Sequence, residues 1–121
     1  MAKIIIVDDI KEIRESAKAI LKGQGYKVLE ASNGRQLIKL LEKNNVDLIL
    51  LDIMMSKEKS DELMSLINKK HPSKIILFSV VKVTDDETRL FLSKSNNIVD
   101  FIQEPFDTED VKYRVKKALV R

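Results

Sequence analysis

The sequence predicts a doubly wound α/β domain, in which helices cover both faces of a parallel sheet. Five short apolar runs alternate with amphipathic segments, and this strict alternation implies right-handed crossovers and an open parallel sheet. Three of the runs, IIIV, LILL and IILF, are continuously apolar, as expected for parallel strands that are buried on both faces. The 121 residues suffice for one hydrophobic core, so we expect a single domain over residues 1–121.

The apolar runs give the expected strands, which are residues 3–7, 27–31, 48–51, 75–79 and 99–102. A first helix is expected after the first strand, because apolar residues recur at i, i+4, i+7 and i+8 before two glycines (Ile13, Ala17, Ile20 and Leu21; Gly23 and Gly25). Asn33 followed by Gln36 resembles a helix N-cap signature and predicts a second helix, which ends at Asn44-Asn45.

Three further helices are expected in the second half of the chain. A short one covers residues 61–70, with Leu63, Leu66 and Ile67 as its inner stripe, and ends before His71-Pro72. A capping box at residues 84–87 begins a fourth helix, whose few apolar members predict loose packing. Asp107 is the expected N-cap of a fifth helix, because acidic residues follow it directly and lysines come later.

Composition limits the possible partners. The formal net charge is +3, but the cations are spread over the expected helix faces, as Lys11, Arg14 and Lys18 are, with no aromatic residues between them. A solvated surface explains these cations more simply than nucleic-acid binding, which we rank last. No stretch approaches the roughly 20 apolar residues of a membrane span, and no secretory cleavage site follows the first apolar run. We therefore expect no membrane partner and a cytoplasmic location.

Aspartates end two of the expected strands. Asp8 and Asp9 follow the first strand and Asp52 follows the third, so three carboxylates should meet at the carboxyl edge of the sheet, where ligands bind in such folds. Clustered like charges either oppose ionisation or require a counter-cation, and a divalent cation resolves the repulsion. Because the chain has no cysteine and one histidine, its ligands must be oxygen atoms, and Mg²⁺ is the natural candidate. Taken separately, each aspartate is explained as readily by helix capping or an ordinary loop.

Four segments carry a resemblance to a known family: residues 4–9 (IIIVDD), 51–55 (LDIMM), 75–79 (IILFS) and 104–107 (EPFD). Together they resemble the receiver domains of two-component response regulators, over essentially the whole chain. The resemblance implies a flavodoxin-like (βα)5 three-layer sandwich with the strand order 2-1-3-4-5. It also implies that a histidine kinase transfers a phosphoryl group to the protein with the help of Mg²⁺.

The resemblance assigns a role to each residue of the acidic site. Asp52 is the phosphoryl acceptor and a Mg²⁺ ligand. Asp9 is a direct ligand, and Asp8 is either a second direct ligand or a water-mediated one. The backbone carbonyl of Met54, two residues past the acceptor, completes the ligands from the protein.

Two residues resemble the switch pair of the family. Ser79 is the hydroxyl that binds the phosphoryl oxygen, and Phe101 is the aromatic residue that moves inward behind it. As sequence features alone, Phe101 is better explained by core packing, and Ser79 is a serine at the end of a strand whose place opposite Asp52 alone favours a functional role.

Glu104 departs from the family, which has a lysine before Pro105. The lysine binds the acyl phosphate, whereas a carboxylate repels it. Three alternatives remain open at this stage: Glu104 turns to solvent while Lys82 or Lys57 supplies a cation; phosphorylation is impaired; or the carboxylate strengthens cation binding at rest. The Glu104-Pro105 bond is also a candidate cis peptide by resemblance.

The leading hypothesis is a signalling module, not an enzyme beyond self-phosphorylation and autodephosphorylation at Asp52. A sensor histidine kinase or a phosphotransfer protein donates the phosphoryl group, and a downstream protein binds the face made by the fourth helix, fifth strand and fifth helix. The rival hypothesis is a phosphorylation-independent interaction domain with the same fold. We expect a monomer or a weak phosphorylation-dependent dimer, either as a free-standing regulator or as the front end of a longer one.

Overall fold

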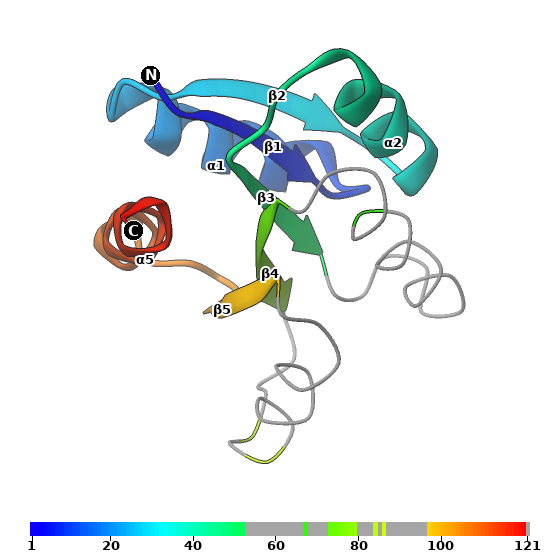
Figure 1. Ribbon diagram of the computed structural model, residues 1–121. Coiled ribbons are helices and arrows are strands. Elements are labelled where there is room, and N and C mark those ends of the chain that lie inside the picture. Colours follow the sequence, from blue (N-terminus) through cyan, green and yellow to red (C-terminus); the bar gives the residue numbers. More distant parts are fainter. Residues whose placement is uncertain (53–66, 68–72, 80–83, 85, 87–96, 121) are drawn as a thin grey trace.

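The computed structural model describes residues 1–52, 67, 73–79, 84, 86 and 97–120. Five parallel strands form one sheet in the order β2-β1-β3-β4-β5 (Figure 1). The strands are β1 (Lys3–Val7), β2 (Lys27–Ala31), β3 (Leu48–Asp52), β4 (Lys74–Ser79) and β5 (Ile98–Gln103). The predicted fold class and strand order are therefore confirmed.

The strand bounds differ from the predicted ones in three of the five strands. The first two strands match, whereas β4 and β5 are longer than predicted and β3 includes Asp52. Asp52 pairs with Phe78 and belongs to the sheet instead of following it. The sequence predicts that the strand ends before Asp52, because carboxylates are depleted in strands. The backbone of β3 therefore fixes the position of this carboxylate.

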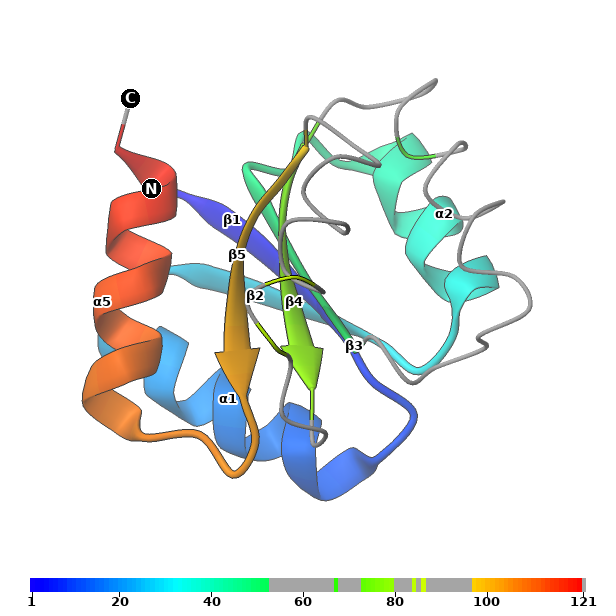
Figure 2. The same ribbon diagram turned by 90° about the horizontal axis from the view of Figure 1, so that it is seen from below.

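Three helices lie among the described residues: α1 (Lys11–Gly23), α2 (Gly34–Lys43) and α5 (Thr108–Leu119). Figures 1 and 2 show α1 and α5 on one face of the sheet and α2 on the other. Ile67 and Asp86 are helical and belong to the two remaining predicted helices, most of which fall outside the described residues. Ile67 is fully buried, as its place in the predicted inner stripe requires.

Alternate residues of each strand build two separate cores, because successive side chains point to opposite faces. The α1–α5 core joins strand residues to both of those helices (Ile4, Ile6, Leu48, Leu50, Ile76, Phe78 and Ile102 with Ala17, Leu21, Val111, Val115 and Ala118). The α2 core lies on the opposite face (Ile5, Val7, Ile49, Leu51, Ile75 and Leu77 with Leu37, Leu41 and Ile67). Both cores are closed to solvent, so function is confined to the edges of the sheet and the outer faces of the helices.

The helix ends confirm two of the predicted caps. The Asn33 side chain accepts a hydrogen bond from the Gln36 backbone N–H at 2.9 Å, and Asp107 accepts one from Glu109 at 3.2 Å. The N-cap of α1 is Ile10, which provides no side-chain cap. Neither Asp8 nor Asp9 is the N-cap residue of α1, although Asp8 Oδ1 accepts a hydrogen bond from the N–H of the N-cap residue Ile10.

Replacing Asn33 with alanine should destabilise the protein by about 1 kcal/mol, the usual effect of losing an N-cap side chain. The Gln36 N–H would lose its acceptor at the start of α2. Urea unfolding followed by circular dichroism measures this change in the free energy of unfolding. Asn45→Ala, in the exposed loop after α2, is the matched control and should change stability by less than half as much.

Within the part of the chain that the structure describes, no helix combines the length and apolar character needed to cross a membrane.

Candidate metal centre

Three carboxylates converge at the carboxyl edge of the sheet. Val7 pairs with Leu51, so Asp8 and Asp52 occupy neighbouring positions one residue further along adjacent strands. Both continue the alternation that points toward α1 and α5. Asp8, Asp9 and Asp52 each offer an oxygen atom, and these oxygens lie within 4.8 Å of one another. The predicted convergence of the three aspartates is therefore present in the structure.

The three carboxylates differ in burial. Asp8 is fully buried, Asp52 is 7% exposed, and Asp9 is exposed at the mouth of the site. The backbone N–H of Asp8 donates to the Ala31 carbonyl at 3.1 Å, which extends the sheet contact by one residue. One carboxylate oxygen of Asp8, Oδ1, accepts from the Ile10 N–H at 2.9 Å. The other, Oδ2, is buried and has no hydrogen-bond partner among the described residues.

Electrostatics favour a cation at this position. The pKa of Asp8 is raised to about 6, mainly by burial and in addition by the negative charges of Asp52 and Asp9, while the hydrogen bond from the Ile10 N–H opposes this rise. A buried oxygen without a partner, beside two more carboxylates, is the environment that a hard divalent cation neutralises. Mg²⁺ therefore fits the donors present, and Asp8, Asp9 and Asp52 are the residues that could hold it.

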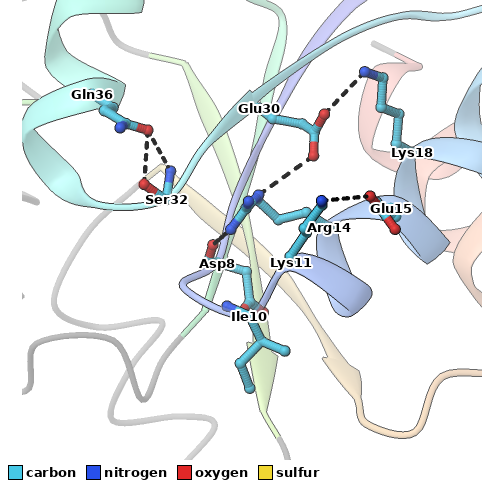
Figure 3. Close-up of polar contacts among 9 residues, drawn as sticks. All are labelled: Asp8, Ile10, Lys11, Arg14, Glu15, Lys18, Glu30, Ser32 and Gln36. Carbon is cyan, nitrogen blue, oxygen red and sulfur yellow. Dashed lines mark hydrogen bonds and ion pairs between the residues drawn. The ribbon is translucent and has the colours of Figure 1, made fainter.

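A charged network supports the loop that carries the first two aspartates (Figure 3). Arg14 Nη1 donates to the Asp8 backbone carbonyl at 2.7 Å, and Arg14 Nε lies 3.4 Å from Glu30. Lys18 Nζ lies 2.9 Å from the second oxygen of Glu30. These cations hold the pKa of Glu30 below its usual range, with the Lys18 hydrogen bond as the main cause. The network ties α1 to the ends of β1 and β2.

This network corrects the interpretation of Arg14 and Lys18 as part of a solvated surface. The Arg14 side chain is only 16% exposed. The i, i+4 spacing of the two cations could have suggested a shared partner, and Glu30, the one acidic residue of its strand, was the available signal. Sequence alone gave no indication that the guanidinium reaches the backbone of Asp8.

Arg14→Ala should lower the free energy of unfolding by about 1–3 kcal/mol, because the Asp8 carbonyl and Glu30 both lose a charged partner. Arg14→Lys should recover only part of this loss, since a lysine cannot bind both groups with one planar fork. Chemical unfolding of both variants measures the effect. Equal stability of the alanine variant and the wild type would show that the network is not needed to hold the loop.

Glu104 lies one residue past the end of β5 and is buried, with 7% of its surface exposed. Its side chain does not turn to solvent, so the first of the three alternatives for this residue is wrong. Two residues further on, Phe106 packs against the α1–α5 core, and its ring centroid lies 5.5 Å from that of the buried Phe78. The segment that carries Glu104 is thereby held against the sheet. The Glu104-Pro105 peptide bond is cis, as the resemblance implied.

Burial is also the main cause of the raised pKa of Glu104, which is about 7. The negative charges of Asp8 and Asp52 add to it, which places the Glu104 carboxyl in the electrostatic field of the acidic site. Glu104 therefore loses its proton less readily than a carboxyl group in water does. Its Oε1 atom is buried and finds no hydrogen-bond partner among the residues described.

The remaining predicted residues are placed only in part. Ser79 ends β4, where its backbone pairs with that of Gln103. Phe101 pairs with Leu77 in the middle of β5 and is half-buried against the α2 core. Met54 lies outside the described residues, as do the two lysines proposed as substitute cations (Lys57 and Lys82).

A comparison with known proteins identifies the family. The response regulator receiver domain model matches residues 4–116. The chain belongs to the response-regulator receiver family. Receiver domains are generally switch domains of two-component systems, not enzymes, and they typically bind Mg²⁺ at an acidic cluster. Asp8, Asp9 and Asp52 form such a cluster in this receiver domain.

Relatives of this receiver domain include regulators and a kinase. The transcriptional regulatory protein CpxR of Escherichia coli (strain K12) is 28% identical over 121 residues, which cover 100% of this chain and 50% of CpxR. The CAI-1 autoinducer sensor kinase/phosphatase CqsS of Vibrio cholerae is 34% identical over 110 residues, which cover 88% of this chain and 16% of CqsS. This receiver domain thus spans about half the length of CpxR and a smaller share of CqsS.

Solved structures agree with the fold. A response regulator from Thermotoga maritima superimposes with a TM-score of 0.87 at 25% identity, covering 98% of both chains. TrrA from the same organism, solved in complex with Mg²⁺-BeF, gives a TM-score of 0.79 at 32% identity and covers 98% of this chain and 100% of TrrA.

Proposed function

We propose that this receiver domain accepts a phosphoryl group on Asp52 from the phosphohistidine of a sensor histidine kinase or a phosphotransfer protein. The observation that carries the proposal is the buried position of the Asp52 carboxylate at the strand end, beside Asp8 and Asp9. An oxygen of Asp52 would attack the phosphorus atom while the bond between phosphorus and the imidazole nitrogen breaks. The leaving imidazole nitrogen takes up a proton from solvent, so the products are an acyl phosphate on Asp52 and a neutral histidine on the donor.

The residues of the site divide the work of this reaction. Asp8 and Asp9 would hold Mg²⁺ together with Asp52 and the backbone carbonyl of Met54. A bound Mg²⁺ supplies positive charge that offsets the charges of the nucleophile and of the phosphoryl oxygens. Asp52 is fixed by its place in β3, so it is oriented for attack without reorganisation of the backbone.

Ser79 and Phe101 would report the modification. The Ser79 hydroxyl would donate to a phosphoryl oxygen, and Phe101 would adjust its half-buried position behind it. The readout surface would be the face that includes β5, α5 and the helix containing Asp86, which binds a downstream protein. Residues 1–121 would act as one domain, monomeric or weakly dimeric when phosphorylated, in the cytoplasm.

One observation favours a second function. The buried Glu104 carboxylate lies in the field of Asp8 and Asp52, and it would repel an incoming phosphoryl dianion where the family has an attractive lysine. A receiver domain that binds its partner without phosphorylation is therefore the alternative.

Acetyl phosphate tests the proposal without knowledge of the kinase. Incubation with acetyl phosphate and Mg²⁺ should add one phosphoryl group to the intact protein, and a chelator should prevent the addition. Mass spectrometry of the protein and its peptides measures the reaction. A second measurement is the NMR spectrum of the backbone amides with Mg²⁺ and beryllofluoride added. If no phosphoryl group is added and this spectrum does not change, the phosphorylation-independent domain is favoured.

A further inference from the structure

Glu104 carries a feature that the aspartate cluster does not explain. Only 7% of its surface is exposed, and its Oε1 atom has no hydrogen-bond partner among the described residues. The alternation of β5 assigns Glu104 to the same face as Ile102, which belongs to the α1–α5 core. Asp8 and Asp52 extend that same face at the ends of β1 and β3. Glu104, Asp8 and Asp52 therefore lie on the same face of the sheet, at its carboxyl edge.

Glu104 lies close to the aspartate cluster without belonging to it. The oxygens of Asp8, Asp9 and Asp52 lie within 4.8 Å of one another, and Glu104 is not a member of that group. Glu104 is near enough, however, for the charges of Asp8 and Asp52 to act on it. Mg²⁺ usually keeps several waters of its own, so a carboxylate beside its direct ligands can contact the ion through one of those waters. A buried oxygen without a partner is a suitable acceptor for such a water.

Charge favours the same arrangement. A receiver domain with lysine at this position has three carboxylates and one ammonium group around the cation. This chain has four carboxylates when Glu104 is ionised, so the site is more negative by two charges. The additional negative charge attracts a divalent cation in the resting protein, and it opposes the phosphoryl dianion for the same reason.

We propose that Glu104 is a fourth carboxylate of the cation site, which accepts a hydrogen bond from a cation-bound water and strengthens binding of Mg²⁺ to the unphosphorylated protein. This inference rests on the proposed function, because it assumes that Asp8, Asp9 and Asp52 hold the ion. It adds a specific role for the residue that replaces the lysine of the family.

Calorimetric titration of the metal-free protein with MgCl₂ alone, at about pH 8 so that Glu104 is ionised, tests the proposal. Glu104→Gln keeps the shape of the side chain and removes its charge. It should weaken Mg²⁺ binding by at least about tenfold, the usual effect of removing a partner of a metal-bound group. Glu15→Gln, which removes the same charge from an exposed position on α1, is the matched control and should leave the affinity within about twofold.

Asp9→Asn separates the two levels of the proposal, and an unfolding curve for each variant confirms that it is folded. If Asp9→Asn loses binding while Glu104→Gln matches the wild type, the role of Glu104 is wrong and the aspartate site stands. Equal weakening by Glu104→Gln and Glu15→Gln would also overturn the role of Glu104, since it would show a general effect of surface charge. If Asp9→Asn binds Mg²⁺ as the wild type does, the metal centre itself is wrong.

Discussion

Without divalent cations, the protein will be more stable toward urea at pH 5 than at pH 8. Burial raises the pKa of Glu104 to about 7 and that of Asp8 to about 6, whereas both carboxyls ionise near their ordinary values of 4.5 and 3.8 in the unfolded chain. Between those limits the folded state binds more protons than the unfolded state. The free energy of unfolding therefore falls as the pH rises through this window and levels off above about pH 7.

The expected size of this change is large for a small domain. A pKa difference of this size at Glu104 corresponds to on the order of 3 kcal/mol, and the contribution of Asp8 is not additive with it because the two charges interact. Glu30 has a lowered pKa and opposes this trend only below about pH 5, where the unfolded chain takes up protons.

Urea unfolding at the two pH values, in the presence of a chelator, measures the difference in the free energy of unfolding. Glu104→Gln should lose the larger part of it, because the glutamine does not titrate. Addition of Mg²⁺ at pH 8 should raise the stability of the wild type toward its value at pH 5, since a cation replaces the missing protons. A wild-type stability that rises steadily from pH 5 to pH 8 would contradict the buried acidic site.

Asp52→Asn should abolish phosphoryl transfer and, in the metal-free protein, stabilise the fold. An amide oxygen is not a nucleophile of comparable strength, so no phosphoryl group should be detected after incubation with acetyl phosphate and Mg²⁺. The same substitution removes one buried negative charge beside Asp8 and Glu104. We expect a gain of about 1–2 kcal/mol at pH 8, because repulsion between like charges is relieved.

Intact-mass spectrometry and urea unfolding measure the two effects of Asp52→Asn. Asp86→Asn, an exposed aspartate in a helical segment, is the matched control and should accept a phosphoryl group as the wild type does. Phosphorylation of the Asp52→Asn protein would show that another residue is the phosphoryl acceptor. A strong loss of stability in this variant would show that Asp52 serves the fold and not the reaction.

The sheet and the described helices follow from short-range patterns in the sequence. Short apolar runs predicted β1 and β2 at their observed bounds, and the Asn33 and Asp107 signatures predicted the starts of α2 and α5. Strand ends also predicted the aspartate cluster, because the carboxyl ends of parallel strands meet at one edge. These features depend on the period and the polarity of neighbouring residues, which are visible in one dimension.

The residues that were misinterpreted depend on long-range packing. Arginine is usually a surface residue, yet Arg14 binds the backbone of Asp8, which follows β1, and the side chain of Glu30 in β2. Glu104 was expected to reach solvent as one alternative, yet the segment after β5 turns back over the α1–α5 core and buries it. In both cases the three-dimensional path of the chain decides the environment, and local spacing contains no information about that path.

Diffraction from crystals soaked in Mn²⁺, measured at a wavelength where manganese scatters anomalously, tests the metal centre most directly. One anomalous peak should lie among the carboxylate oxygens of Asp8, Asp9 and Asp52, at a distance from each that fits direct coordination. The contradicting result is an anomalous peak only at other acidic residues, with no ion at the three aspartates. That result would rule out the metal centre and the phosphoryl transfer that depends on it.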